Sequence, residues 1–530
     1  MNKTLAATAL ALSLTLTTGS AGIAFAAPGL PSTNVAWQPA ASDADVDRAF
    51  AQARAAGKPV LLYWGASWCP PCNQLKATLF NRQDFATLSK SFVAVHVDGD
   101  RPGAQKLGQR FKVSGYPTVV LFSPQGREIT RLPGEVDAPQ VMAVLQQGLA
   151  NGRPVQAVLG DALAGKTLTA GDWRMLAFYS WETDEQQLVP RAEFPDTLVK
   201  LALAAPPSEA ETATRLWLKA LAASDEGKGL KPDAALRERV LAVLGDPQRS
   251  RVQMDVLANS APDIVRTLEP ATGAGRNTLV AAFDTILQRF GADATLSRGD
   301  RMQALYARVE LARLDVPKSA LAPALPAPLL ADVRAQVAQA DREIRDGYER
   351  QAVITAAAAT LSTAGLWSDS EALLKANLSK SHSPYYLMSQ LGGNARKQGR
   401  TDEALQWYGK AFETSQGPAT RLQWGASYLT ALVDLAPADG QRIEQTASRL
   451  LTEAAADSGA FEGRSARSLQ RVGTKLQTWN KGRDHDAVLQ RLRTQLQGVC
   501  KGVDGALSDK AGASPRAACQ ALLKPIPAAA

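Results

Sequence analysis

Short hydrophobic runs recur along the first part of the chain, after an irregular N-terminal stretch. Three of them, PVLLYWG (59–65), FVAVHVD (92–98) and TVVLF (118–122), are almost wholly apolar, which is typical of strands buried on both faces. A turn at Gly126 leads into REITRL (127–132), where a fourth strand is expected. The pattern therefore predicts a sheet built mainly from buried strands.

Segments with helical spacing alternate with these strands. Ser42 followed by Asp45 forms a capping-box signal for a helix that Gly57 ends. Another helix is expected to start near Cys69, and the last one of this unit starts at Asp137. The alternation of helices and strands predicts an α/β unit over residues 42–151. The expected helices cover residues 43–57, 69–88, 104–113 and 138–150.

The pattern changes after residue 152, where strand-like runs vanish and helical spacing, broken by Gly and Pro, continues. Residues 362–381 resemble residues 396–415, and Gly365 and Gly399 in these segments are 34 residues apart. That distance is the period of the tetratricopeptide (TPR) helix–turn–helix repeat. We expect a large all-α region that is partly a TPR-like solenoid; the alternative is an irregular helical bundle.

The N-terminus has the pattern of a secretory signal. Lys3 precedes a short apolar stretch, and small residues follow up to Ala24-Phe25-Ala26, as at a cleavage site. We therefore expect a cleaved signal peptide and export to the periplasm, where disulfides are permitted. The expected organisation is a signal peptide 1–26, a linker 27–41, an α/β domain 42–151, a helical region 152–344, TPR-like repeats 345–455 and a C-terminal helical segment 456–530 with a disulfide.

Composition and charge limit the classes of function. The chain has 530 residues, too many for one core, and 45% hydrophobic with 21% charged residues is typical of a soluble globular protein. The formal net charge is +8, but Lys and Arg are interspersed with Asp and Glu. Because no block of like charges occurs in the sequence, we expect no nucleic-acid partner.

Four cysteines form two local pairs, Cys69 with Cys72 and Cys500 with Cys519. The first pair stands in WCPPC, between a buried strand and the expected start of a helix. A helix start offers unpaired N–H groups that favour a thiolate, and it tolerates prolines. Cys72 would lie one turn along, close enough to meet Cys69. The pattern therefore favours a dithiol that opens and closes.

A zinc site and an inert structural bridge are the other interpretations of WCPPC. Zinc sites need further ligands, but no second CxxC exists, and His96, His382 and His485 are scattered without metal spacing. Thiol-based copper handling would need Met-rich or His-rich tracts, which the sequence lacks. We expect no metal and no cofactor.

PVLLYWGASWCPPC, followed by VDGD and VSGYPTVVLF, resembles the thioredoxin family over about residues 43–150. It is most similar to periplasmic thioredoxin-like domains such as the C-terminal domain of the DsbD-type membrane reductase. The resemblance implies a thioredoxin fold and a cis peptide bond before Pro117, which would lie beside the cysteines and form part of the substrate-binding site. It also implies that Tyr116 receives substrate as an added strand and that Trp68 lines the substrate-facing surface. From the sequence alone, Trp68 could simply pack.

Two positions depart from thioredoxin itself. Tyr63 stands where the family has a buried Asp that helps proton transfer, and Ala94 replaces the Lys partner of that Asp. The rate and pH profile of the family therefore do not carry over. The two prolines between the cysteines supply no N–H to a thiolate, which points to a reducing couple.

The second cysteine pair, Cys500 and Cys519, lies near the ends of two helical stretches without a proline or helix-start signature. We expect a structural disulfide between these helices; the alternative is a second redox-active pair. The aromatic residues Trp407, Tyr408 and Trp424 are interpreted as packing between helices rather than as a ligand site.

Two classes of function follow from these patterns. The first is a periplasmic thiol:disulfide oxidoreductase in which Cys69 attacks and Cys72 resolves, because only Cys69 lies at the exposed start of the helix. It would act as a reductase on protein thiols or disulfides, draw electrons from a membrane partner and dock substrates on its helical region. The second is a TPR-like interaction scaffold whose thioredoxin domain has marginal activity. The presence of both cysteines favours the first.

Overall fold

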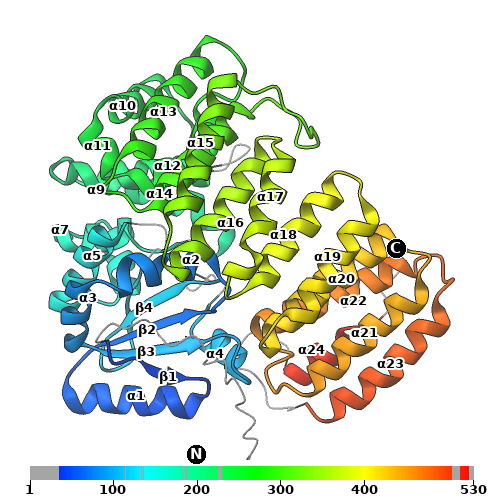
Figure 1. Ribbon diagram of the computed structural model, residues 1–530. Coiled ribbons are helices and arrows are strands. Elements are labelled where there is room, and N and C mark those ends of the chain that lie inside the picture. Colours follow the sequence, from blue (N-terminus) through cyan, green and yellow to red (C-terminus); the bar gives the residue numbers. More distant parts are fainter. Residues whose placement is uncertain are drawn as a thin grey trace, which may run out of the picture.

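The computed structural model describes residues 35–113, 115–132, 134, 137–181, 183–184, 188–224, 229–503 and 514–524. The expected signal peptide, residues 1–26, lies outside these ranges. An α/β domain is followed by an extensive all-helical region (Figure 1), so the predicted fold class is confirmed.

A mixed five-stranded sheet forms the centre of the α/β domain, with the strand order β1-β3-β2-β4-β5. Strands β1 and β2 run parallel to β3, whereas β4 runs antiparallel to both β2 and β5. Every residue of the central strand β2 is buried, which explains why its sequence is continuously hydrophobic. The strands are β1 Gln38–Ala40, β2 Val60–Gly65, β3 Val93–Asp98, β4 Thr118–Phe122 and β5 Glu128–Leu132.

The first strand corrects the prediction of a linker over residues 27–41. Gln38–Ala40 pairs in parallel with Val95–Val97 at the edge of the sheet. Just before this strand, the ring of Trp37 meets the ring of Phe80 edge-on, with 5.1 Å between centroids. Three paired residues are too few to show a period in the sequence, so the strand depends on its pairing partner and on the burial of its neighbour.

The helices of the α/β domain differ from expectation in one place. The first begins with the predicted capping box, in which the Ser42 hydroxyl accepts the Asp45 N–H, and ends at Gly57 in the left-handed conformation. The single helix expected over 69–88 is divided, because a π-helical turn follows α2 and the chain leaves the helix at Asn81. The helices are α1 Asp43–Ala56, α2 Pro70–Leu75, the π-helix Lys76–Phe80, α3 Gln83–Leu88, α4 Ala104–Arg110 and α5 Ala138–Asn151.

Helices follow one another along the chain beyond α5. The first group is α6 Val155–Leu163, α7 Ala170–Ala177, α8 Phe194–Ala204, α9 Ala210–Ala223, α10 Ala234–Gly245, α11 Pro247–Arg251, α12 Met254–Leu268, α13 Ala274–Ala292, α14 Arg298–Ala312 and α15 Ala327–Glu343. The second group is α16 Gly347–Thr363, α17 Trp367–Asn377, α18 Pro384–Lys397, α19 Thr401–Thr414, α20 Pro418–Leu435, α21 Gly440–Ala455, α22 Gly463–Trp479, α23 Asp486–Lys501 and α24 Pro515–Ala521.

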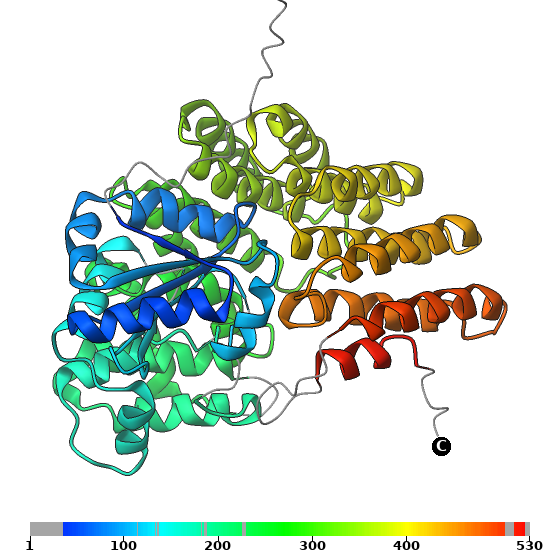
Figure 2. The same ribbon diagram turned by 90° about the horizontal axis from the view of Figure 1, so that it is seen from below.

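The helical region curves around the α/β domain (Figure 1). Helix α16 packs against α2, and α22 packs against α4. Seen from below, α19 to α24 lie in a stack at one side of the α/β domain (Figure 2). After α15 the chain therefore returns to the start of α2, where the CxxC motif stands.

Two glycines that the sequence pairs at the repeat period have the same role in the structure. Gly365 follows α16 and Gly399 follows α18, and both have a left-handed backbone, with φ of 79° and 73°. A left-handed residue after a helix end is most easily supplied by glycine. Each glycine thus turns the chain from one helix into the next. The TPR-like character of residues 345–455 as a whole stays a prediction.

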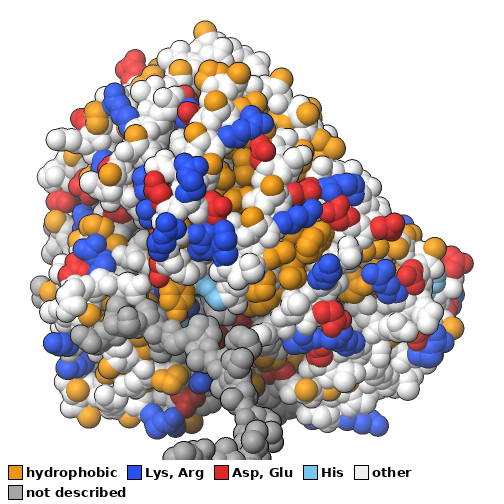
Figure 3. All heavy atoms as spheres, in the orientation of Figure 1, with side chains coloured by type: hydrophobic (Ala, Val, Ile, Leu, Met, Phe, Trp, Pro, Cys, Tyr) orange, Lys and Arg blue, Asp and Glu red, His pale blue; other side chains and the backbone are white. Residues whose placement is uncertain are grey.

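The surface mixes charges of both signs. On the face seen in Figure 3, Lys and Arg alternate with Asp and Glu, and hydrophobic side chains gather over α18 and α19. Within the described ranges, no helix is both long enough and apolar enough to span a bilayer.

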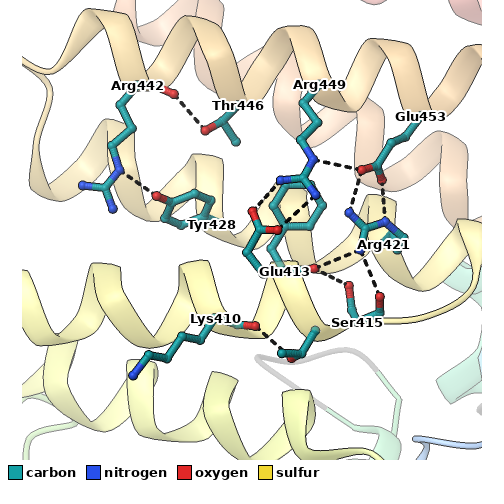
Figure 4. A network of polar contacts seen from close by, with 11 residues as sticks. Lys410, Glu413, Ser415, Arg421, Tyr428, Arg442, Thr446, Arg449 and Glu453 are labelled. Atoms are coloured by element: carbon teal, nitrogen blue, oxygen red, sulfur yellow. Dashed lines mark hydrogen bonds and ion pairs between the residues drawn. The ribbon is translucent and has the colours of Figure 1, made fainter.

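Ion pairs fasten the helices α19, α20 and α21 to one another (Figure 4). Arg421 donates to both carboxylate oxygens of Glu453, at 2.7 and 3.0 Å. Arg449 reaches the same carboxylate at 3.2 Å and also pairs with Glu413. Both guanidinium groups lie over the ring of Phe412, at 5.0 and 4.6 Å. Paired, partly buried arginines of this kind hold the three helices at a set spacing.

The second cysteine pair lies at the C-terminal end of this stack. Cys500 at the end of α23 and Cys519 in α24 are joined by a disulfide, with 5.7 Å between their Cα atoms. Both residues are buried in the core that α18 to α24 share. The bridge therefore ties the short last helix to the body of the stack.

Replacing Cys500 and Cys519 together by Ser should lower the free energy of unfolding by about 3 kcal/mol, because the bridge closes a loop of about twenty residues. Urea unfolding of the full chain measures this loss.

Mild reductant that opens the Cys69–Cys72 bridge should leave the C-terminal bridge closed, as read by peptide mapping. Free thiols at both positions in protein isolated from an oxidising compartment would contradict a structural role.

Candidate functional site

The CxxC pair stands between the central strand and the first turn of α2. Cys69 has an extended backbone and caps α2. Its Sγ accepts the N–H of Cys72 at 3.2 Å, whereas Pro70 and Pro71 have no N–H to donate. The two cysteines are joined by a disulfide, with 5.2 Å between their Cα atoms. The structure thus places the pair at the helix start that the sequence predicts.

The loop before α2 is held from both parts of the protein. Within the α/β domain, the buried Asn73 amide donates to the Ser67 carbonyl at 2.7 Å. From the helical region, Gln351 donates to the Trp68 carbonyl at 3.3 Å, and His382 Nε2 lies 3.0 Å from the Ser67 carbonyl oxygen. Helical residues therefore hydrogen-bond directly to the backbone that carries the cysteines.

The disulfide is buried, which corrects an expectation from the sequence. A cysteine at a helix start was expected to be exposed, but Cys69 is 2% exposed and Cys72 is fully buried. Both belong to a hydrophobic core shared with side chains of α18 to α24. The helical region therefore covers the redox pair.

Trp68 is the centre of this cover. Its ring stacks on Tyr386 of α18 with 6.0 Å between centroids and meets Trp424 of α20 edge-on at 6.2 Å. The guanidinium carbon of Arg464, on α22, lies 4.3 Å from the indole centroid. Trp68 is only 6% exposed, so the chain's own helices occupy most of the surface on which a substrate was expected. Trp424 packs between elements as predicted, but against the redox site.

Asp100 connects Trp68 to the helical region. Its carboxylate accepts the Trp68 indole N–H at 2.9 Å and the hydroxyl of Thr420 through its other oxygen. Burial raises the pKa of the Asp100 carboxyl to about 6; the Thr420 hydroxyl opposes this shift, and the nearby Asp98 adds to it. Arg464 also opposes the shift. This contact between the two parts of the protein therefore changes its charge near neutral pH.

Tyr116 and Pro117 form another wall of the site. The peptide bond between them is cis, as the family resemblance implies. The Tyr116 hydroxyl lies 2.7 Å from Gln105 Nε2, and Gln105 Oε1 accepts the backbone N–H of Arg464 at 2.9 Å. The Tyr116 ring lies 6.4 Å from the Trp68 ring and 5.0 Å from the Arg464 guanidinium carbon. Arg464 therefore contacts two of the three residues predicted to receive substrate.

Tyr63 occupies the position of the family's buried carboxylate. It is buried, its hydroxyl has no hydrogen-bond partner among the described residues, and burial raises its pKa far above the usual range. Its ring stacks on His96 at 4.9 Å, and burial lowers the pKa of His96 to about 3. Both side chains are therefore neutral at neutral pH, and this position supplies no carboxylate to accept a proton.

Two cavities flank the start of α2. One has a volume of about 660 Å³ and lies between Cys69 and α22, and the other, of about 420 Å³, lies toward α14 and α16. Pro70, Pro71 and Tyr386 line both cavities and therefore separate them. Cys69 lines the larger of these two cavities and Cys72 lines neither, so the larger cavity gives a reacting group access to the pair from the Cys69 side.

The residues that complete the site from the helical region were not predicted. They are Tyr386 on α18, Thr420 and Trp424 on α20, and Arg464 on α22. Their local sequence resembles that of any amphipathic helix, so no motif identifies them; only Trp424 was noticed, and for packing. In the described part of the chain, no group of three or more His, Cys, Asp or Glu could hold a metal ion.

Asp100 should make stability depend on pH. The folded-state pKa of Asp100, about 6, exceeds the ordinary 3.8. Its contribution to the free energy of unfolding is therefore fully present below about pH 4 and is lost as the pH rises through about 6. Asp100→Asn removes this pH dependence. In urea unfolding, the free energy of unfolding of the variant should therefore rise relative to that of wild type as the pH is raised from about 4 to about 7. Asp263→Asn, which removes an exposed carboxylate of α12, is the control. A stability difference that is the same at both pH values would contradict the assignment.

Comparison with known proteins supports the α/β domain. The model of a family described as a thioredoxin-like domain matches residues 46–149. The thiol:disulfide interchange protein DsbD 1 of Pseudomonas aeruginosa is 34% identical over 114 residues, which cover 21% of this chain and 19% of that protein. DsbD of Klebsiella pneumoniae is 31% identical over 128 residues, 23% of this chain and 21% of that protein.

The match spans about a fifth of the length of these relatives. A thioredoxin from Thermus thermophilus, solved in solution, is 28% identical and covers 22% of this chain and 86% of its own, with a TM-score of 0.19. The large helical region that follows contributes side chains to the site. Residues 46–149 are a thioredoxin-like domain related to the thioredoxin domain of DsbD.

Proposed function

We propose that the protein is a thiol:disulfide oxidoreductase that exchanges disulfides with protein substrates through Cys69 and Cys72. The observation that carries the proposal is the asymmetry of the pair. Cys69 lines a cavity at the start of α2, whereas Cys72 lies fully buried behind it. An attacking thiolate needs access and a resolving thiol needs only proximity, and this arrangement provides both.

In the reducing direction, the thiolate of Cys69 attacks a sulfur of the substrate disulfide. The substrate S–S bond breaks, and the leaving sulfur takes the electron pair and then a proton. The thiolate of Cys72 next attacks the mixed disulfide at Cys69, closes the Cys69–Cys72 bond and releases the second substrate thiol. Two electrons and two protons pass from the cysteine pair to the substrate.

Trp68, Tyr116 and Pro117 are proposed to position the substrate. Trp68 and Tyr116 line the same cavity as Cys69, which supports this role. The backbone next to the cis bond would pair with an extended substrate segment as an added strand. Because side chains of α18, α20 and α22 complete the cavity, the helical region is proposed to select the substrate rather than only to dock it.

The proposed compartment is the periplasm, and a membrane protein is the proposed source of electrons. The signal-like N-terminal sequence and the named relatives, which are thiol:disulfide interchange proteins, support both proposals. A cysteine pair that acts as a reductase must be re-reduced after each cycle, and an oxidising compartment does not supply thiols for this step.

The redox potential of the Cys69–Cys72 pair should lie closer to the reducing end of the thioredoxin-like range, about −270 mV, than to the oxidising end, about −120 mV. The reason is the sparse stabilisation of the thiolate: of the residues at the first turn, only Cys72 donates an N–H to Cys69 Sγ, at 3.2 Å. A less stable thiolate means a less stable reduced form. Equilibration with glutathione buffers, read by mass shift after alkylation, decides the question, and a potential near about −120 mV would make the protein an oxidant.

An interaction scaffold is the second candidate function. The observation that favours it is the burial of the disulfide beneath Tyr386, Trp424 and Arg464, which restricts a large folded substrate. In that case partners would bind the helical region and the cysteines would not be needed.

Trapping separates the two candidates. With Cys72→Ser, the mixed disulfide at Cys69 cannot be resolved, so we expect a defined set of proteins linked through Cys69 and released by reductant. The matched control is the Cys69→Ser/Cys72→Ser double variant, which should lose all of these links. If the same partners are recovered with the control, the scaffold function is favoured and the enzyme proposal is wrong.

A further inference from the structure

The larger cavity beside Cys69 has one wall from each part of the protein. The α/β domain contributes Trp68, Cys69 and Tyr116, and α22 contributes Arg464 and Arg471. Its volume of about 660 Å³ is in the range of small-molecule sites and suits a short chain segment better than a folded domain. Arg471 is exposed, so the cavity opens to solvent along α22.

The wall from α22 is basic. Arg467, Ser468 and Arg471 follow Arg464 by three, four and seven residues, which places all four on one face of the helix, and all four line the cavity. None of the lining side chains in the described part of the chain is acidic. The positive charges of this wall therefore face the space in front of Cys69.

The guanidinium of Arg464 is surrounded mainly by aromatic rings. It lies over the rings of Trp68 and Tyr116, at 4.3 and 5.0 Å, and no carboxylate of the described residues forms a salt bridge with it. Burial lowers the pKa of this guanidinium, which indicates a cation with incomplete compensation. Arg471 donates to the Ser468 hydroxyl at 3.4 Å. An anion entering the cavity would stabilise both groups.

Helix α20, which packs against α22, adds a hydrogen-bond acceptor to the cavity. Gln423 of α20 lines the cavity, and its Oε1 is buried without a hydrogen-bond partner among the described residues. A buried acceptor without a partner is costly, so a ligand that donates an N–H would be favoured here. Peptide backbone provides such donors, and an acidic side chain or terminus provides the anion.

We propose that this cavity binds thiol or disulfide substrates that carry a carboxylate next to the reacting sulfur, and that Arg464 and Arg471 pair with this carboxylate. The proposal rests on the proposed function, because it gives the substrate class of the same cysteine pair. The carboxylate can belong to an acidic segment of a protein or to a small acidic thiol. The exchange is the one already described, with the substrate sulfur held in front of Cys69 while its carboxylate contacts α22.

The test uses the full chain, reduced and freed of reductant, in single-turnover reactions with synthetic disulfides. Two peptide disulfides differ only in a residue beside cysteine, Glu in one and Gln in the other, and glutathione disulfide represents the small acidic class. We expect the Glu peptide to react about threefold to tenfold faster than the Gln peptide. The preference should shrink when salt is raised from about 0.1 M to about 1 M.

Variants assign the preference to α22. Arg471→Gln, at an exposed position, should lower the Glu-to-Gln rate ratio toward one, because the Glu peptide should slow more than the Gln peptide. Arg464→Lys keeps the charge and should preserve the preference better than Arg464→Gln. The control is Arg239→Gln, which removes the same charge from an exposed position on α10 and should leave the rates of both peptides unchanged. A Glu-to-Gln rate ratio that falls toward one in the α22 variants but not in Arg239→Gln supports the proposal.

The outcomes separate this inference from the proposed function. If both peptides react at equal rates that Arg471→Gln does not change, the basic cavity does not select carboxylates, although the oxidoreductase function stands. If neither peptide reacts and no mixed disulfide forms with Cys72→Ser, the proposed function fails and this inference fails with it. A fast Glu peptide with slow glutathione disulfide identifies a protein segment as the source of the carboxylate; fast reaction of both shows that the charged group suffices.

Discussion

The enclosure of Trp68 is the interaction on which the rest of the structure depends. One indole is stacked by Tyr386, met edge-on by Trp424 and covered by the guanidinium of Arg464, while its N–H is taken by Asp100. An aromatic ring buried in this way contributes a large hydrophobic area together with specific ring contacts. Because its partners come from three helices of one part and a loop of the other, the thioredoxin-like domain and the helical region share one core.

The helices that enclose Trp68 also restrict which substrates can reach Cys69. In a thioredoxin-like domain standing alone, the face around the first cysteine would meet solvent and any incoming protein. Here α18, α20 and α22 cover that face, and Cys69 lines a cavity with an aromatic wall and a basic wall. The same side chains that close the interface therefore define what can react. Selectivity and stability are coupled, since weakening the contacts of Trp68 would open both the interface and the active site.

Electrostatics adds to this coupling. Asp100 accepts the indole N–H of Trp68 and Arg464 lies over its ring, and burial disfavours the charged form of each. Each partly offsets the cost of the other, so removing either leaves the other less compensated. The Thr420 hydroxyl of α20 donates to Asp100. Gln105 accepts the backbone N–H of Arg464 and donates to the Tyr116 hydroxyl. The interface is thus both hydrophobic and polar.

Local pattern alone determined most of the thioredoxin-like domain. The apolar runs of β2, β3 and β4, the capping box at Ser42 and the turn at Gly57 depend on neighbours in the chain, and so does the position of WCPPC before α2. Tertiary structure alone decided β1, whose pairing partner lies far along the chain, the π-helical turn after α2 and the burial of Cys69. It also decided the site residues from α18, α20 and α22: Gln105 and Arg464, for example, meet across 359 positions. No short-range periodicity encodes such a contact, because it exists only when separate hydrophobic faces have packed together.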